Sequence, residues 1–486
     1  MRTDRKHLHL RHGWYWIVGL MAFLWVLIRS GANPKRLTYP CQQAAMPIAA
    51  NWLLALIAFV SGSLFLRRFT KFSGIAMVIA GAIWFSGSVS DLTWGGTNSS
   101  KPLPAWEVRD PISKVFVIDS LPPTTGSLAA GDSTVPNAYL SDPTMDALVT
   151  HLASQGVFLY KTAIHPDGIV SADDIVLIKA NFYFEGRNTT NTDRIKGLIW
   201  SILNHPNGFT GEVIVFENTQ GGPIDQNDNN SDDPNQSILN VISTFRAKHY
   251  PVYLKNCTLF REVDGSEYSN GDYDDCFVYD PVTKFTYPKF RTPSGQYRVS
   301  LRYGIWDSTS ATYDISRRCI ISFPVLKGHN MAGATIVIKN YVGVGTTAYD
   351  WRWGGGGTMH YTYFWGPYAM LARLMSVAYP RLSIVDAAWT NINGPGGANV
   401  VHTNKLVAST DPVAADWYAA KYILTPIAMF PSWTNPDLPG GTYYNTLGNW
   451  ARYLQDSTSH TVTKDSSQIS VYHWTWGPVP IQLSSF

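Results

Sequence analysis

Hydrophobic positions divide the chain into two parts of different character. Three uncharged apolar stretches crowd the first 90 residues, at 14–28, 47–66 and 74–90. About 20 apolar residues span the hydrocarbon core of a bilayer, so the second stretch is long enough and the other two approach that length. We therefore expect residues 1–95 to form a membrane anchor with two or three transmembrane helices.

Charges beside these stretches predict which side of the membrane the rest of the chain occupies. Seven Lys and Arg residues lie in segments 1–13 and 67–71 together, against three in segment 29–46. The positive-inside rule then places the first two segments in the cytoplasm. A cleaved signal peptide is the alternative for the first stretch and leads to the same orientation. We expect a multi-pass protein of the cell membrane, with its large C-terminal domain on the extracytoplasmic side.

After a Gly-, Ser- and Pro-rich linker at 96–110, the pattern becomes that of a folded domain. Short apolar runs typical of buried strands alternate with amphipathic stretches typical of helices. This rhythm predicts an α/β domain with a largely parallel sheet over residues 111–486. The expected strands are 114–119, 173–182, 211–218, 319–325, 334–340, 381–389 and 404–410, and the expected helices are 191–205, 235–249, 367–379 and 411–423.

Residues from about 250 to 318 depart from this rhythm. They are rich in Tyr, Asp, Gly and Thr and lack an amphipathic helical stretch. We interpret this segment as a β-rich insertion in the α/β domain.

Composition narrows the classes of function. Only 15% of the residues are charged and the net charge is +3, which is too small to indicate nucleic-acid binding. The four cysteines, at 41, 257, 276 and 319, show no C-x-x-C spacing of a zinc or iron–sulfur site. Cys257 and Cys276 could form a disulfide outside the cytoplasm or remain free thiols, and spacing alone leaves both open.

Five motifs occur in order between residues 175 and 417: IVLIKANF, VIVFEN, FPVLKGHNMAGATIVIKNYVG, DAAWTNINGPGG and LVASTDPVAADW. Together they resemble the domain-of-unknown-function family 362. The segment NPKRLTYPCQ near the anchor also resembles one found in some exported members. Val325 stands where the family often has the first lysine of a P-K-x-K turn. Many members carry ferredoxin-like cysteine clusters; this chain has none, so we expect no iron–sulfur cluster.

Polar residues end or follow several expected strands, which is where parallel α/β sheets bind ligands. Lysines from three strands would meet in one cleft and neutralise a small carboxylate or phosphate. Acid–base groups there would suit an enzyme. We predict ligand-binding roles for Lys179, Asn181, Lys327, Lys339, Asn340, Asn393, Gly394 and Asp411, and catalytic roles for Glu217, His329 and Asp386.

Structural alternatives exist for these residues. Lysines at strand ends often reach solvent, and Asp411 before a proline has the pattern of a helix N-cap. His329 could serve as a hydrogen-bonding residue or bind a metal ion together with carboxylates. The sequence identifies no particular cofactor.

Two loops offer further alternatives. The segment DQNDNNSDD at 225–233 has oxygen ligands at alternating positions but lacks the glycine and glutamate of a calcium loop, which favours a solvated Asx-rich loop. The segment 351–368 has seven aromatic residues and four consecutive glycines. It could form a lid, an aromatic cluster, or a surface for sugars or proteins.

These observations predict a membrane-anchored extracytoplasmic protein that binds a small anionic ligand, with enzymatic activity left open. The alternative is a non-enzymatic surface protein that binds a glycan or a protein through its aromatic loops.

Overall fold

A computed structural model describes residues 105–122, 132–219, 223–233, 235–281, 285–345 and 370–476. The predicted membrane anchor, most of the linker and the aromatic loop at 351–368 lie outside these ranges. No helix within these ranges combines the length and the apolar character needed to cross a membrane.

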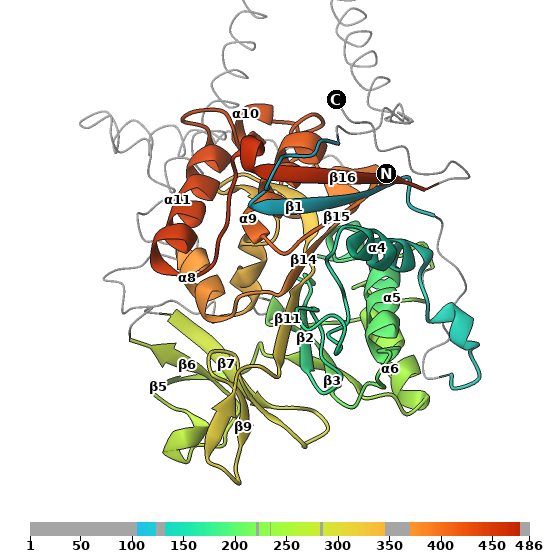
Figure 1. The fold of residues 1–486 in the computed structure, drawn as a ribbon, viewed down its shortest axis with the longest axis vertical. Coiled ribbons are helices and arrows are strands. Elements are labelled where there is room, and N and C mark those ends of the chain that lie inside the picture. Colours follow the sequence, from blue (N-terminus) through green and yellow to red (C-terminus); the bar gives the residue numbers. More distant parts are fainter. Residues whose placement is uncertain are drawn as a thin grey trace, which may run out of the picture. The chain divides into compact units, whose positions relative to one another are not determined.

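Ten strands form the central sheet, which runs through the domain between two layers of helices (Figure 1). Neighbouring strands are parallel except at β15, which is antiparallel to both β1 and β14, and at β13, which is antiparallel to β12. The predicted strand 404–410 is therefore part of the antiparallel strand. The spatial order is β16 (Ile469–Thr475), β1 (Ser113–Asp119), β15 (Val400–Ser409), β14 (Leu382–Asn391), β11 (Arg318–Ser322), β2 (Ile175–Lys179), β3 (Glu212–Glu217) and β4 (Val252–Asn256), with β12 (Val325–His329) and β13 (Gly333–Thr335) attached beside β14.

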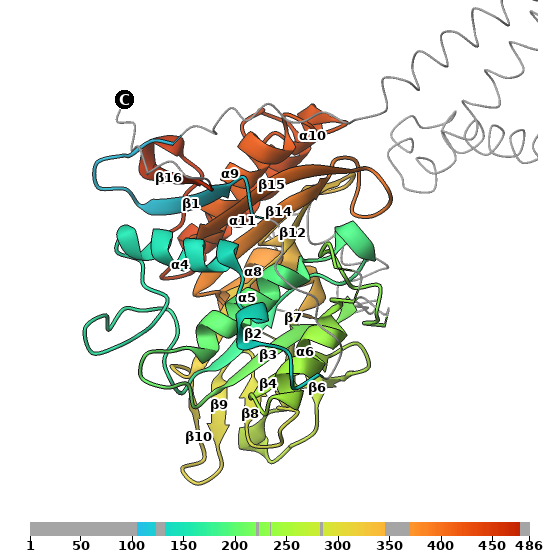
Figure 2. The same ribbon diagram turned by 90° about the vertical axis from the view of Figure 1, so that its right-hand side faces the viewer.

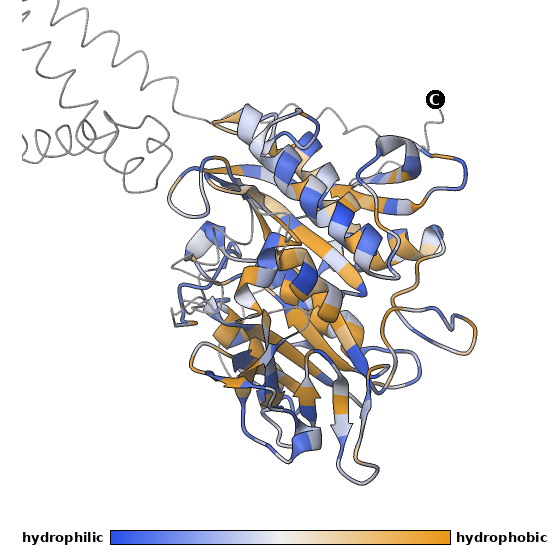
Figure 3. Cartoon of the chain, turned by 90° about the vertical axis from the view of Figure 1, so that its left-hand side faces the viewer, coloured by the Kyte–Doolittle hydropathy of each residue, from blue (hydrophilic) through white to orange (hydrophobic). Residues whose placement is uncertain are grey.

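Helices cover both faces of this sheet, as the alternating pattern predicts (Figure 2). In β2, Val176 and Ile178 face one core while Ile175 and Leu177 face the other, because side chains alternate along a strand. The strands are accordingly hydrophobic, and hydrophilic positions gather on the outer helices (Figure 3). The first core contains residues of α4 (Pro143–Ser154), α5 (Thr192–Leu203) and α6 (Ile238–Ala247), and the second contains residues of α8 (Met370–Val377), α9 (Pro412–Tyr418) and α11 (Thr442–Ser457).

The predicted β-rich insertion is a second, six-stranded sheet. Its neighbouring strands are antiparallel except for the β5–β6 pair. The insertion begins later than expected, because Val252 of β4 pairs with Val213 and so extends the central sheet. In spatial order the strands are β10 (Thr312–Asp314), β9 (Gly304–Asp307), β8 (Arg298–Ser300), β7 (Phe285–Arg291), β6 (Cys276–Asp280) and β5 (Arg261–Asp264).

The predicted strand 334–340 was wrong over most of its length. Only Gly333–Thr335 is extended, and Lys339–Gly343 forms a short 3₁₀ helix, η6. The cause lies on α9: the Asp416 carboxylate accepts the backbone N–H groups of Val337, at 2.7 Å, and Ile338, at 3.3 Å. A buried side chain thus satisfies donors that a neighbouring strand would otherwise have to satisfy.

The question of a disulfide is also resolved by the fold. Cys257, Cys276 and Cys319 are all buried free thiols.

Candidate functional site

A cavity of about 250 Å³ lies beyond the carboxyl ends of β2 and β3. Its lining brings together six of the residues singled out in the sequence, from elements spread over 160 positions. This volume suits a small metabolite, because sites for drug-sized ligands begin near about 300 Å³. The six residues are Asn181, Glu217, Lys327, His329, Lys339 and Asn340.

Lys179 stands behind this lining as one half of a buried ion pair. Its ammonium lies 2.7 Å from a carboxylate oxygen of Glu217, and neither side chain is more than 2% exposed. The same nitrogen also donates to the Ala180 carbonyl and to Oδ1 of Asn340, at 3.1 Å. Burial lowers the pKa of Lys179, and the Glu217 carboxylate opposes that effect. Three acceptors, one of them ionic, use all three donors of an ammonium group, so Lys179 is a structural cation.

Gly343 makes room for this pair. A Cβ atom at that position would lie 1.8 Å from Oε1 of Glu217 and 2.7 Å from the Lys179 nitrogen. Such distances are far inside van der Waals contact, so only glycine fits at this point of η6 without moving the pair.

Lys327 has different partners. It points from β12 toward Oδ1 of Asn181, at 2.9 Å, and toward the backbone carbonyl of Asn188, at 2.8 Å. Its nitrogen also lies 5.2 Å from the centre of the Phe184 ring. Burial lowers the pKa of Lys327 to about 7, and the charges of Lys339 and Lys179 add to that effect while Glu217 opposes it.

Lys339 contributes a second buried amine to the cavity. It begins η6 and its residue is 5% exposed. Burial lowers the pKa of Lys339 to about 7. The charges of Lys327 and Lys339 repel each other, which disfavours the charged form of Lys327 further.

His329 presents a fixed ring to the same cavity. Its Nδ1 accepts the backbone N–H groups of Met331 and Ala332, both at 3.1 Å. Nδ1 is therefore the unprotonated nitrogen, and Nε2 carries the hydrogen of the neutral ring. In this tautomer, Nε2 is the hydrogen-bond donor of the ring.

Two predicted carboxylates do not line the cavity. Asp386 is buried on β14, where it accepts the backbone N–H groups of Asn191, at 2.7 Å, and Ala388, at 3.0 Å. Burial raises the pKa of Asp386 to about 6. Asp411 caps α9 by accepting the N–H groups of Val413 and Ala414. Asp386 thus holds the start of α5 through the N–H of Asn191, and Asp411 stabilises the start of α9 as its N-cap.

The glycine-rich loop after β14 also differs from a backbone anion cradle. The N–H groups of Asn393 and Gly394 both donate to Oδ1 of Asn391, at 3.1 Å, so they turn away from a ligand. Pro395 of the same loop does line the cavity. At Gly396, an added Cβ would lie 2.4 Å from the Phe184 ring, so this glycine lets the loop pack against the aromatic wall.

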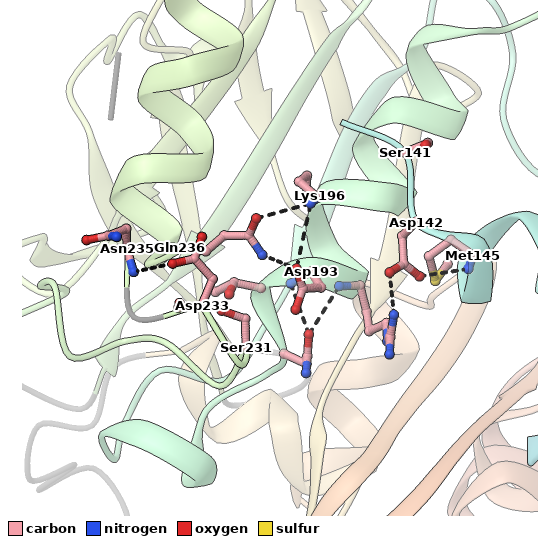
Figure 4. A network of polar contacts seen from close by, with 12 residues as sticks. Ser141, Asp142, Met145, Asp193, Lys196, Ser231, Asp233, Asn235 and Gln236 are labelled. Atoms are coloured by element: carbon pink, nitrogen blue, oxygen red, sulfur yellow. Dashed lines mark hydrogen bonds and ion pairs between the residues drawn. The ribbon is translucent and has the colours of Figure 1, made fainter. Parts of the chain in front are cut away.

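A separate network at the start of α5 contains buried charged residues that form ion pairs with one another (Figure 4). Asp193 forms an ion pair with Lys196 and accepts from the Gln236 amide, and Lys196 in turn donates to Gln236. Asp142 pairs with Arg194 and caps α4. These contacts tie α4 and α5 to the segment that follows the Asx-rich loop, which makes this network structural.

The part of the chain that the structure describes contains no cluster of potential metal ligands. No group of three or more His, Cys, Asp and Glu side chains there is arranged to hold an ion. The Asx-rich loop instead bonds to its own backbone, as when Asp228 accepts the N–H of Asp225 at 2.7 Å.

Several lining residues were not predicted from the sequence. Tyr183 and Phe184 lie in the loop after β2, and Thr335 ends β13 opposite Lys327. The aromatic run NFYF after the strand was a usable signal for the first two. Gly343, the last residue of the KNYVG motif, is part of the family resemblance in the sequence. Only the structure shows why a glycine stands there, because a larger residue would collide with Glu217.

Comparison with known proteins adds one finding to this geometry. Residues 292–421 match the family described as domain of unknown function DUF362. The matched segment is about a quarter of the chain and extends from the second sheet through β15 and α9. It contains Lys327, His329 and Lys339, whereas Lys179 and Glu217 precede it. The resemblance of residues 175–291 to DUF362 remains a prediction.

No curated protein and no solved structure matches the chain. The DUF362 segment also carries no cysteine cluster within the described residues.

Proposed function

We propose that the cavity binds a small organic or inorganic anion through Lys327, Lys339 and His329. The observation that carries this proposal is that two buried lysines line one cavity of about 250 Å³. The carboxylate that also lines it, Glu217, is already paired with Lys179. An anion placed between Lys327 and Lys339 would stabilise the charged form of these ammonium groups.

His329 and Asn340 add neutral polar groups to this site. The Nε2–H of His329 can donate to a ligand oxygen while its Nδ1 stays bound to the backbone. Asn340 accepts a hydrogen bond from the Lys179 ammonium and donates one to the Lys179 backbone carbonyl. These bonds keep the Lys179–Glu217 ion pair beside the proposed ligand position and not within it. Met331 and Val342 give the cavity an apolar side that would suit a short carbon chain.

The membrane location belongs to the same proposal. It rests on the three apolar stretches of residues 14–90 and on the excess of Lys and Arg beside them. In this arrangement the anion site faces the extracytoplasmic side.

Titration calorimetry on the purified full-length chain tests the anion site, with acetate and inorganic phosphate as probes. We expect binding of at least one probe, with proton uptake above pH 7 because the bound anion raises the pKa of both lysines. Lys339→Met keeps most of the side-chain volume and removes the charge, so it should weaken binding by about ten-fold or more. Lys161→Met is the matched control, since Lys161 is exposed outside the cavity.

Two results would contradict the proposal. One is the absence of binding of either probe at millimolar concentration. The other is unchanged affinity in Lys339→Met when that variant melts at the wild-type temperature.

A further inference from the structure

Lys179 and Lys327 differ in how many acceptors surround each nitrogen. Lys179 faces three acceptors, including the Glu217 carboxylate, and is held as an ammonium ion. Lys327 faces two acceptors, Oδ1 of Asn181 and the carbonyl of Asn188, and both are neutral. A neutral amine has two N–H donors and one lone pair, so these two acceptors fit the uncharged form of Lys327.

The surroundings favour that uncharged form. Lys327 is buried and shares the cavity with Lys339, whose charge repels a second cation. With its pKa at about 7, roughly half of Lys327 is neutral at pH 7, against about one part in three thousand for a lysine at the ordinary value. Desolvation and a neighbouring cation are the two conditions that activate a lysine as a nucleophile.

We propose that Lys327 forms an imine with a small 2-oxo acid whose carboxylate is held by Lys339. The proposal rests on the anion site described above and names the class of ligand for it. The class follows from the lining: one cation for a carboxylate, one amine for an adjacent carbonyl, and the apolar side chains of Met331 and Val342 for a short carbon chain.

The step balances within the site. The Lys327 lone pair attacks the carbonyl carbon, and the π electrons of the carbonyl move to its oxygen. His329 lies two residues away on the same face of β12, and its Nε2–H can stabilise that oxygen. The carbon–oxygen bond then breaks, and the oxygen leaves as water with the two hydrogens that the amine loses. The product is a carbon–nitrogen double bond to Lys327.

Reductive trapping tests this step on the full-length protein. Pyruvate is the probe, sodium cyanoborohydride reduces any imine to a stable carboxyethyl-lysine, and peptide mass spectrometry locates it. Lactate is the matched control ligand, because it has the carboxylate and similar size but no carbonyl. We expect Lys327 to be modified at least ten-fold faster than the exposed Lys161, and lactate to slow that modification by competition. Lys327→Arg, which keeps a long side chain with N–H donors but has no nucleophilic amine, should lose the fast modification.

Each outcome separates the two proposals. Binding of pyruvate and lactate by calorimetry without fast modification of Lys327 would overturn the imine and leave the anion site standing. Fast modification of Lys339 in place of Lys327 would overturn the assignment of the nucleophile. Neither binding nor modification would overturn both proposals. The competition by lactate uses wild-type protein, so the test does not depend on the folding of a variant.

Discussion

Gly343→Ala is expected to destabilise the domain through the buried ion pair beneath the cavity. The new Cβ would overlap Oε1 of Glu217 at 1.8 Å and crowd the Lys179 nitrogen at 2.7 Å. Glu217 cannot simply swing away, because the same oxygen accepts the N–H groups of Asn218 and Thr219 at 3.1 and 3.2 Å. The clash therefore has to separate the pair or move η6.

The magnitude follows from these contacts. Separating a buried ion pair costs about 3–5 kcal/mol, and forcing a methyl group into a packed core costs about 1–3 kcal/mol. Because the two responses are alternatives, we expect the free energy of unfolding to fall by about 3 kcal/mol.

Gly328→Ala supplies the matched control within the same site. Gly328 lies between Lys327 and His329, yet a Cβ there would meet its nearest heavy atom at 3.4 Å, which is ordinary contact. We expect a loss below about 1 kcal/mol. Urea unfolding followed by tryptophan fluorescence measures both variants, since Trp417 and Trp450 are buried in the same domain.

A double-mutant cycle identifies the cause. In a Glu217→Ala background the closest clash is gone, so adding Gly343→Ala should cost much less than it does in the wild type. Equal stability of Gly343→Ala and Gly328→Ala, or strict additivity in the cycle, would refute the steric reasoning.

Two further predictions concern the lysines and the turn that carries one of them. Burial lowers the pKa of Lys327 and Lys339 to about 7 in the folded domain, so the unfolded chain binds more protons than the folded domain between pH 7 and about 10.5. The free energy of unfolding should therefore rise with pH across that window. Urea unfolding at several pH values checks this, and a Lys339→Met curve as steep as the wild type would count against it. Asp416→Ala removes the acceptor of two backbone N–H groups before η6, which should cost about 2–4 kcal/mol and weaken acetate or phosphate binding at Lys339. Asp416→Asn keeps a carbonyl acceptor and should therefore retain more stability and more anion binding than Asp416→Ala. Equal losses in the two variants would show that the acceptor does not cause the effect.

Local sequence patterns predict several elements of the fold. The apolar run before Lys179 predicts a buried strand because four successive residues, Ile175 to Ile178, are aliphatic, and the structure has β2 at this position. Asn191 predicts the start of a helix by its capping chemistry, and it does accept the N–H groups of Asp193 and Arg194. Such signals act over a few residues, so they survive in any fold.

Contacts between distant residues were beyond the reach of such signals. Asn340 holds Lys179 across 161 positions, and Asp416 bends the segment before Lys339 across 79. Asp386 lies near the end of an expected strand, and only the fold shows that its carboxylate accepts the backbone N–H of Asn191, 195 positions away.

The sequence by itself determined the alternation of strands and helices and the presence of cations near strand ends. Tertiary structure decided which of these cations is paired, which faces neutral oxygens, and which nitrogen of His329 carries the hydrogen. The physical reason is that burial and partner identity set the charge state of an amine or imidazole, and both come from elements that meet only when the sheet is assembled.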